Sequence, residues 1–180
     1  MSRNYRVLLR VNSADAEPIE AIWRQMASLG INDSMVKKSM FAHFSLAIYP
    51  DECPSELFSL LPGIAQQLQP IEIVLSKIDT FPGPEGVLFL ASEANDNLLA
   101  ASNLFHRETK NILEACDHYY RPGNWVPHCT IANPISPQEI TEAIATIPAL
   151  SAEFSPISVT CAALELVEFF PIRRIASYDL

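Results

Sequence analysis

Short apolar runs, bounded by proline, glycine or polar residues, divide the chain into expected strands. The expected strands cover residues 5–11, 43–49, 71–78, 87–91 and 128–132. Residues 154–168 are long enough for two strands or one bent strand, and the Phe170-Pro171 turn separates them from a last strand at 172–178. A turn is also expected at 81–86, where proline and glycine separate two strands that should pair antiparallel.

Apolar residues at helical spacing predict the helices that separate these strands. The first helix is expected from near Pro18 to Gly30, and a long helix should cover about 95–116. Pro62-Gly63 interrupts the helical pattern of 57–68, which predicts a short or broken helix there. A last helix should begin at Ser136-Pro137-Gln138-Glu139, because this stretch has the form of a capping box.

The order of the expected elements repeats in the two halves of the chain. Each half contains a strand, a helix, a strand that begins with histidine, a second helix, and strands joined by a Phe-Pro turn. A duplicated unit of this kind usually closes around an approximate twofold axis, which would bring the two histidine strands together. We therefore expect an α+β fold in which residues 1–180 form a single, internally duplicated domain. Its two pseudo-symmetric lobes would hold two mainly antiparallel sheets around a central cleft.

The two histidine strands carry the same motif. One begins with His43-Phe44-Ser45 and the other with His128-Cys129-Thr130. Because side chains alternate along a strand, His43 and Ser45 should share one face, and so should His128 and Thr130. Two imidazoles and two hydroxyls that meet across a cleft would be equipped for metal-free phosphoryl transfer.

Composition limits the classes of function. The length of 180 residues suits one compact domain, and the net charge of −9 argues against stable binding of long nucleic acid. A small or terminal phosphate could still bind in a locally basic cleft. No apolar run reaches the roughly 18 residues of a membrane span, and the N-terminus has no signal-peptide core. A cytoplasmic protein without membrane association is expected.

The four cysteines are scattered and include no Cys-x-x-Cys pair. They are Cys53, Cys116, Cys129 and Cys161. Their strand or helix context is typical of small buried hydrophobic residues, and their spacing argues against a disulfide or zinc framework.

The motifs resemble those of the 2H (two-histidine) phosphoesterases, which include 2'-5' RNA ligase-like proteins and cyclic nucleotide phosphodiesterases. The family signature is two copies of His-x-[Ser/Thr], each followed by aliphatic strand residues, and both motifs match it. Phe81-Pro82-Gly83 before a strand and Trp125-Val126-Pro127 before the second histidine also look like members of this group. The resemblance implies a bilobed fold with a central cleft, activity on 2',3'-cyclic or 2'-5' linked phosphates, and no metal or other cofactor.

The resemblance also implies a catalytic set of His43, Ser45, His128 and Thr130. Histidine titrates near neutrality, so one imidazole can activate water while the other protonates the leaving ribose oxygen. Either histidine can take either role, because the roles exchange in the reverse reaction. Ser45 and Thr130 would donate hydrogen bonds to the non-bridging phosphate oxygens.

Two aromatic residues are candidates for substrate binding. Trp125 could stack on a nucleobase or pack in the core, and the same alternatives hold for Phe81. Lys37-Lys38 and Arg121 could attract phosphate, although a solvated basic pair is the commoner case. No further basic residue stands beside either motif.

The other two histidines, His106 and His118, have no serine or threonine two positions later. We expect both at the surface, without a role in the site.

Two rival functions remain open from the sequence. A nucleotide-binding sensor on the same fold would bind a ligand without turnover, although both motif histidines are intact. A metal-dependent hydrolase would use His43 and His128 as ligands, but no carboxylate or third histidine stands at ligand spacing in either motif. The sequence therefore favours a monomeric phosphoesterase that acts on a small nucleotide or an RNA terminus.

Overall fold

The fold is seen in a computed structural model that describes residues 4–83, 85–93, 95–151 and 154–180. Pro84 of the turn expected at 81–86 lies outside the described residues, and so do residues 1–3 of the N-terminal segment. Among the described residues, no helix is both long and apolar enough to cross a membrane.

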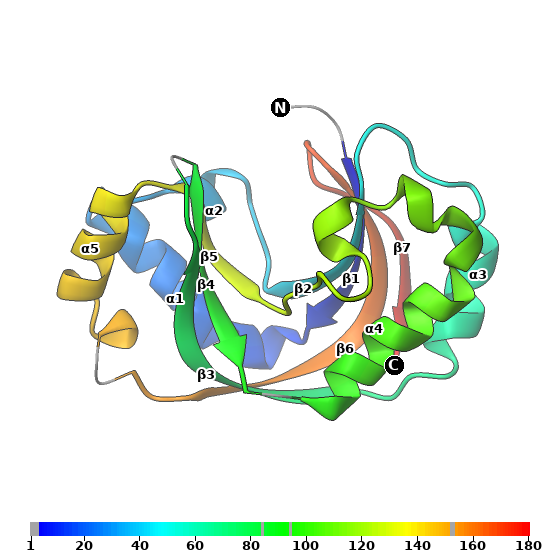
Figure 1. Ribbon diagram of the computed structural model, residues 1–180. Coiled ribbons are helices and arrows are strands. Elements are labelled where there is room, and N and C mark those ends of the chain that lie inside the picture. Colours follow the sequence, from blue (N-terminus) through cyan, green and yellow to red (C-terminus); the bar gives the residue numbers. More distant parts are fainter. Residues whose placement is uncertain (1–3, 84, 94, 152–153) are drawn as a thin grey trace.

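The strands of the described residues form one antiparallel sheet of seven members. They are β1 (Asn4–Val11), β2 (His43–Tyr49), β3 (Ile71–Phe81), β4 (Gly86–Ser92), β5 (Cys129–Ile135), β6 (Ile157–Phe169) and β7 (Arg173–Asp179). The order is β2-β1-β6-β3-β4-β5, and β7 also pairs with β6. The sheet curves so strongly that β2 and β5, the strands at the two ends of this order, lie side by side (Figure 1).

The curved sheet has two arms. The first arm contains β1, β2, β7 and the C-terminal part of β6, whereas the second contains β3, β4 and β5 (Figure 1). Strand β6 joins the arms, because Ile157–Cys161 pair with β3 and Cys161–Phe169 pair with β1. The stretch expected as two strands or one bent strand is thus a single long strand.

The expectation of two sheets is wrong, because the pairing of strands links the two halves of the sequence. Strand β6 of the second half pairs with β1 of the first half. Strands β3 and β6 also pair with each other, so hydrogen bonds run continuously from one arm to the other. The order of elements repeats as expected, whereas an internal duplication stays a prediction.

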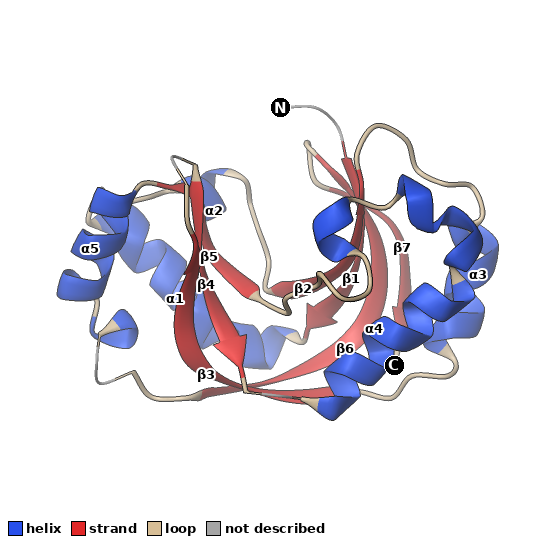
Figure 2. Ribbon diagram, viewed as in Figure 1, coloured by secondary structure: helices blue, strands red, loops and turns tan. Residues whose placement is uncertain are grey.

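Helices cover the outside of the curved sheet (Figure 2). The α-helices are α1 (Ser13–Ser28), α2 (Ser34–Lys37), α3 (Leu57–Ala65), α4 (Asp96–Glu108) and α5 (Pro137–Thr146). The 3-10 helices are η1 (Lys110–Ala115), η2 (His118–Tyr120) and η3 (Pro148–Leu150). Helices α1 and α5 lie beside the second arm, and α3 and α4 lie beside the first.

Local hydrogen bonds explain where the helices begin and end. Helix α1 begins before Pro18, because the Asn12 side chain accepts a hydrogen bond from the Asp15 backbone N–H at 2.9 Å. Helix α4 ends well short of the expected boundary at 116. The buried Thr109 hydroxyl donates to the Phe105 carbonyl at 2.8 Å, and the chain then continues as a 3-10 helix. The capping box at Ser136 is present as predicted.

The apolar core lies between the outer face of the sheet and the helices. Phe44 and Leu46 of β2 are fully buried there, and they alternate with the motif residues that face the concave side. Cys116, Cys129 and Cys161 are buried as expected, whereas Cys53 is only partly buried.

Candidate active site

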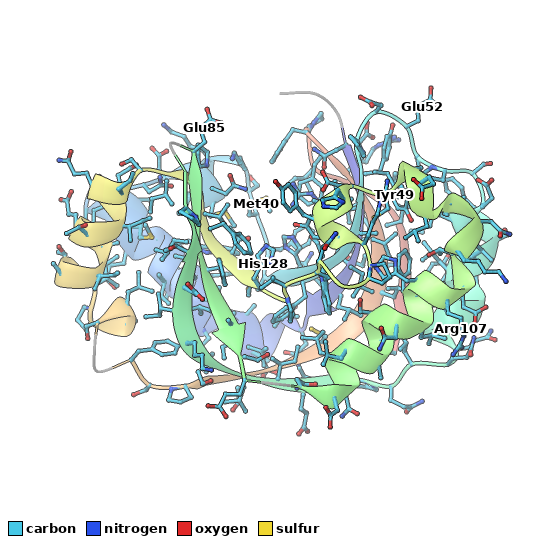
Figure 3. The ribbon with its side chains drawn as sticks, in the orientation of Figure 1. Met40, Tyr49, Glu52, Glu85, Arg107 and His128 are labelled. Carbon is cyan, nitrogen blue, oxygen red and sulfur yellow. The ribbon has the colours of Figure 1, made fainter. Side chains whose placement is uncertain are left out.

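A cavity of 460 Å³ lies on the concave side of the sheet, between the two arms. It is lined by all the residues that the sequence singles out for catalysis and substrate binding: His43, Ser45, Phe81, Trp125, His128 and Thr130. Figure 3 shows His128 in the middle of the molecule, whereas Glu52, Glu85 and Arg107 lie at its periphery. The curvature of the sheet therefore brings the two motifs together.

Strand register explains why the motif side chains share this face. In the first arm, Arg10 pairs with His43 and Leu8 pairs with Ser45. The strands that carry the two motifs, β2 and β5, also contact each other directly.

Backbone carbonyls hold both histidine rings in the same way. Nδ1 of His43 bonds to the Phe41 carbonyl at 2.8 Å, and Nδ1 of His128 bonds to the Val126 carbonyl at 2.8 Å. A carbonyl oxygen can only accept a hydrogen bond, so each Nδ1 carries the proton. In the neutral ring, Nε2 is then left with a free lone pair, and both rings line the cavity.

The hydroxyl residues of the motifs are held by the two tryptophans of the chain. The Trp125 indole donates to the Ser45 carbonyl at 2.9 Å, and the Trp23 indole donates to the Thr130 carbonyl at 3.2 Å. Trp125 also lines the cavity, whereas Trp23 is buried on α1. Each motif is therefore fixed by an indole from another element.

Aromatic rings surround both histidines. The His43 ring lies 5.3 Å from Phe41 and 6.1 Å from Phe169, measured between centroids. The His128 ring lies 5.0 Å from Phe81, edge to face, and 5.2 Å from Phe89. Phe81 thus contacts a motif histidine as well as the cavity.

Burial among these rings lowers the pKa of both histidines. The pKa of His43 falls to about 3, mainly because burial disfavours the charged ring, and the nearby Arg6 and His128 add to this effect. The bond to the Phe41 carbonyl opposes the shift. Burial also lowers the pKa of His128. Both rings are therefore neutral at pH 7 in the free protein.

The cavity also contains functional groups that the sequence alone does not indicate. Arg6 and Tyr120 line it, and Arg6 lies on β1 next to the first motif strand. Burial lowers the pKa of Arg6 and raises that of Tyr120. A signal for Arg6 exists in the sequence. Val7 and Leu9 belong to the core, and side chains alternate along a strand, so Arg6 is expected on the opposite, concave face.

Several other polar residues fall outside the main cavity. Lys37 forms an ion pair with Asp33 at 2.8 Å, and Arg121 forms one with Glu114 at 3.0 Å. The charge of each is therefore balanced by a carboxylate outside the cavity. His118 is exposed as expected. The expectation for His106 is wrong, because His106 is buried on α4 near the backbone of β2 and η2, where burial lowers its pKa. The described residues contain no group of three histidine, cysteine or carboxylate side chains arranged to hold a metal ion.

The sequence profile of the 2'-5' RNA ligase superfamily matches residues 12–169, from the start of α1 to the end of β6. The chain belongs to this superfamily. Both motifs of the 2H phosphoesterases lie within the matched region, in agreement with the resemblance noted in the sequence. No curated protein matches the chain at the sequence level.

Solved structures of the superfamily share the fold over the whole chain. E. coli LigT complexed with 3'-AMP has a TM-score of 0.64 at 13% identity, with 100% of this chain and 99% of LigT covered. TT0787 of Thermus thermophilus has a TM-score of 0.59 at 16% identity, with 98% and 97% covered. Usb1 of Kluyveromyces marxianus has a TM-score of 0.51 at 13% identity, with 99% and 97% covered.

Proposed function

We propose that the protein is a metal-independent phosphoesterase that hydrolyses 2',3'-cyclic or 2'-5' phosphodiester bonds of a nucleotide or RNA end. One observation carries the proposal: two histidines, each with Nδ1 bonded to a carbonyl and Nε2 left free, line one cavity beside two hydroxyl residues. This arrangement supplies a base, an acid and two hydrogen-bond donors within one enclosed space.

The reaction follows from these groups. Nε2 of one histidine takes a proton from water while the water oxygen forms a bond to phosphorus. The bond from phosphorus to the ribose oxygen breaks, and Nε2 of the other, protonated histidine gives its proton to that oxygen. The Ser45 and Thr130 hydroxyls donate hydrogen bonds to the non-bridging oxygens, where charge develops in the transition state.

Substrate binding would favour uptake of a proton from solvent by the second histidine. Both histidines are neutral in the free protein at pH 7, because burial lowers their pKa. A bound phosphodiester carries a negative charge, and a nearby negative charge raises the pKa of histidine. Substrate binding would thus favour the protonated ring that acts as the acid.

The walls of the cavity favour a nucleotide. Trp125 and Phe81 offer aromatic faces for a base, and the exposed Tyr119 extends this wall. The structures of E. coli LigT include complexes with 3'-AMP, ATP and NADP+, which supports nucleotide binding in this superfamily. The net charge of −9 favours a small nucleotide or a short RNA end over a long RNA.

The proposal is tested by turnover in EDTA of 2',3'-cyclic nucleotides, ADP-ribose 1'',2''-cyclic phosphate and a 2'-5' dinucleotide. We expect hydrolysis of at least one compound, and a fall in kcat of about 10²- to 10⁴-fold in His43→Gln and in His128→Gln. His118→Gln is the matched control, since His118 is exposed and outside the cavity. Nucleotide binding without turnover would contradict the proposal and identify a sensor, and loss of activity in EDTA would identify a metal-dependent enzyme.

A further inference from the structure

The basic residues of the described chain differ in how their charge is balanced. Most of them pair with a carboxylate. These pairs are Arg10–Glu165, Arg24–Glu17, Lys37–Asp33, Arg107–Glu108, Arg121–Glu114, Arg173–Glu168 and Arg174–Glu165. Lys77 and Lys110 are exposed to solvent. Arg6 and Lys38 are partly buried, and neither has a carboxylate partner among the described residues.

These two side chains line the same small cavity. It has a volume of 40 Å³, and its wall also contains Met40 and Phe170. Arg6, His43, Thr130 and Asn133 line both this cavity and the main one, so the two are neighbours at the first motif. Figure 3 shows Met40 between the arms, on the same side of the molecule as His128. The small cavity is thus an extension of the candidate active site.

Both cations are held in place but keep hydrogen-bond donors free. Nε of Arg6 donates to the Asn4 side chain at 3.1 Å, and the guanidinium carbon lies 4.3 Å from the centre of the Phe169 ring. Nζ of Lys38 donates to the Asn133 carbonyl at 2.6 Å. Arginine has five N–H donors and lysine has three, so both have donors left for a ligand.

In the protein without a ligand, the surroundings of Arg6 and Lys38 disfavour the positive charge of both side chains. Burial lowers the pKa of Arg6, and the pKa of Lys38 is lowered by burial and then by the charge of Arg6. No aspartate or glutamate of the described chain lines either cavity. Two neighbouring cations without a counter-charge are stabilised by an anionic ligand, because charge-assisted bonds offset the cost of burial.

We infer that Arg6 and Lys38 form a subsite for a second phosphoryl group of the substrate, beside the phosphate that reacts. This inference rests on the proposed function. A space of 40 Å³ exceeds the roughly 10–15 Å³ that one water needs, so it admits a small polar group. The aromatic wall formed by Trp125 and Tyr119 belongs to the main cavity alone, which leaves that region for the base.

The test compares adenosine 2',3'-cyclic phosphate with the same compound carrying a 5'-phosphate. We expect kcat/KM to be about ten- to a hundredfold higher for the 5'-phosphorylated substrate. Lys38→Met should reduce this preference at least about tenfold, since one charge-assisted contact is lost. Lys37→Met is the matched control, because Lys37 is adjacent in sequence but pairs with Asp33 and lines neither cavity.

A third substrate identifies the source of the second phosphate. In the dinucleotide ApA 2',3'-cyclic phosphate, the same 5' oxygen carries a diester instead of a monoester. A preference for this dinucleotide that depends on Lys38 would support the subsite and point to RNA ends. A preference confined to the 5'-monophosphate would support it and point to mononucleotides.

Binding separates this inference from the proposed function. Titration calorimetry with adenosine 3'-phosphate and adenosine 3',5'-bisphosphate gives a ratio of Kd values that needs no turnover. A ratio that favours the bisphosphate, and that falls in Lys38→Met and in Arg6→Gln, supports the subsite even if no substrate is hydrolysed. If both variants keep the wild-type ratio of Kd values, including the case in which affinity for both ligands falls equally, the cations do not bind a second phosphate.

Discussion

At the scale of single residues, the two histidines depend on backbone groups for their tautomer. The carbonyls of Phe41 and Val126 fix Nδ1–H in each ring, in the place where many enzymes use a carboxylate. A carbonyl is uncharged, so it stabilises the protonated ring less than a carboxylate does. This difference helps to explain why burial prevails and the pKa of both rings is lowered.

The low pKa of His43 predicts how stability changes with pH. Below pH 6.5 the unfolded state binds a proton at His43, whereas the folded state does so only near pH 3, so acid favours unfolding. Between these values, the native protein should lose up to about 1.4 kcal/mol per pH unit relative to His43→Gln. Urea unfolding of both proteins from pH 7.5 to pH 4 measures the difference. Parallel curves would contradict the prediction.

The sequence predicts that the two motifs lie together, as the cavity lining shows, but it does not predict the cations beside them. Paired His-x-Ser and His-x-Thr motifs point to one site because two copies of a rare pattern repeat in matching positions. Lys38 resembles any solvated lysine in the sequence, and only the fold of the chain before β2 places it beside Arg6. Such long-range contacts leave no local pattern to read.

At the scale of elements, the site depends on contacts that cross from one element to another. The Trp23 indole of α1 holds β5 at the Thr130 carbonyl, although Trp23 lies outside the cavity. Helix α1 was expected from its apolar spacing, but this hydrogen bond could not be predicted, because it joins residues far apart in the sequence.

Trp23→Phe tests whether this bond positions the second motif. The variant keeps an aromatic ring but leaves a carbonyl without its donor, so we expect a loss of about 1–3 kcal/mol in unfolding free energy. If the bond positions Thr130, kcat should fall several-fold while KM changes little. Met26→Leu, another buried change on α1, is the control. A loss of stability with unchanged kcat would leave the bond a purely structural role.

At the scale of the whole molecule, the continuous sheet predicts a single unfolding transition. Strands β3 and β6 pair directly, so neither arm can lose its strands without exposing the other. Trp125 bonds to the first arm and Trp23 to the second, so Trp23→Phe and Trp125→Phe leave one fluorescent reporter each. In both variants, urea transitions by fluorescence and by far-ultraviolet circular dichroism should coincide. Separate transitions would show that the arms unfold independently.

The sequence predicts the order of the elements but not the single sheet that they form. The repeated order of elements is visible along the chain. The pairing of β6 with both β1 and β3, which joins the two halves, is not. A strand does not specify its neighbour through its own alternation of residues. The single sheet could therefore be recognised only from the folded chain.

The pairing of strands across the two halves has a consequence for a chain cut in the turn between β3 and β4. One fragment would carry His43 and the other His128, and each would expose strand edges that normally pair with the missing fragment. Neither fragment alone would carry both motif histidines. Reassociation of the two fragments would rebuild the sheet and the cavity together, so activity would report directly on the meeting of two separate polypeptides.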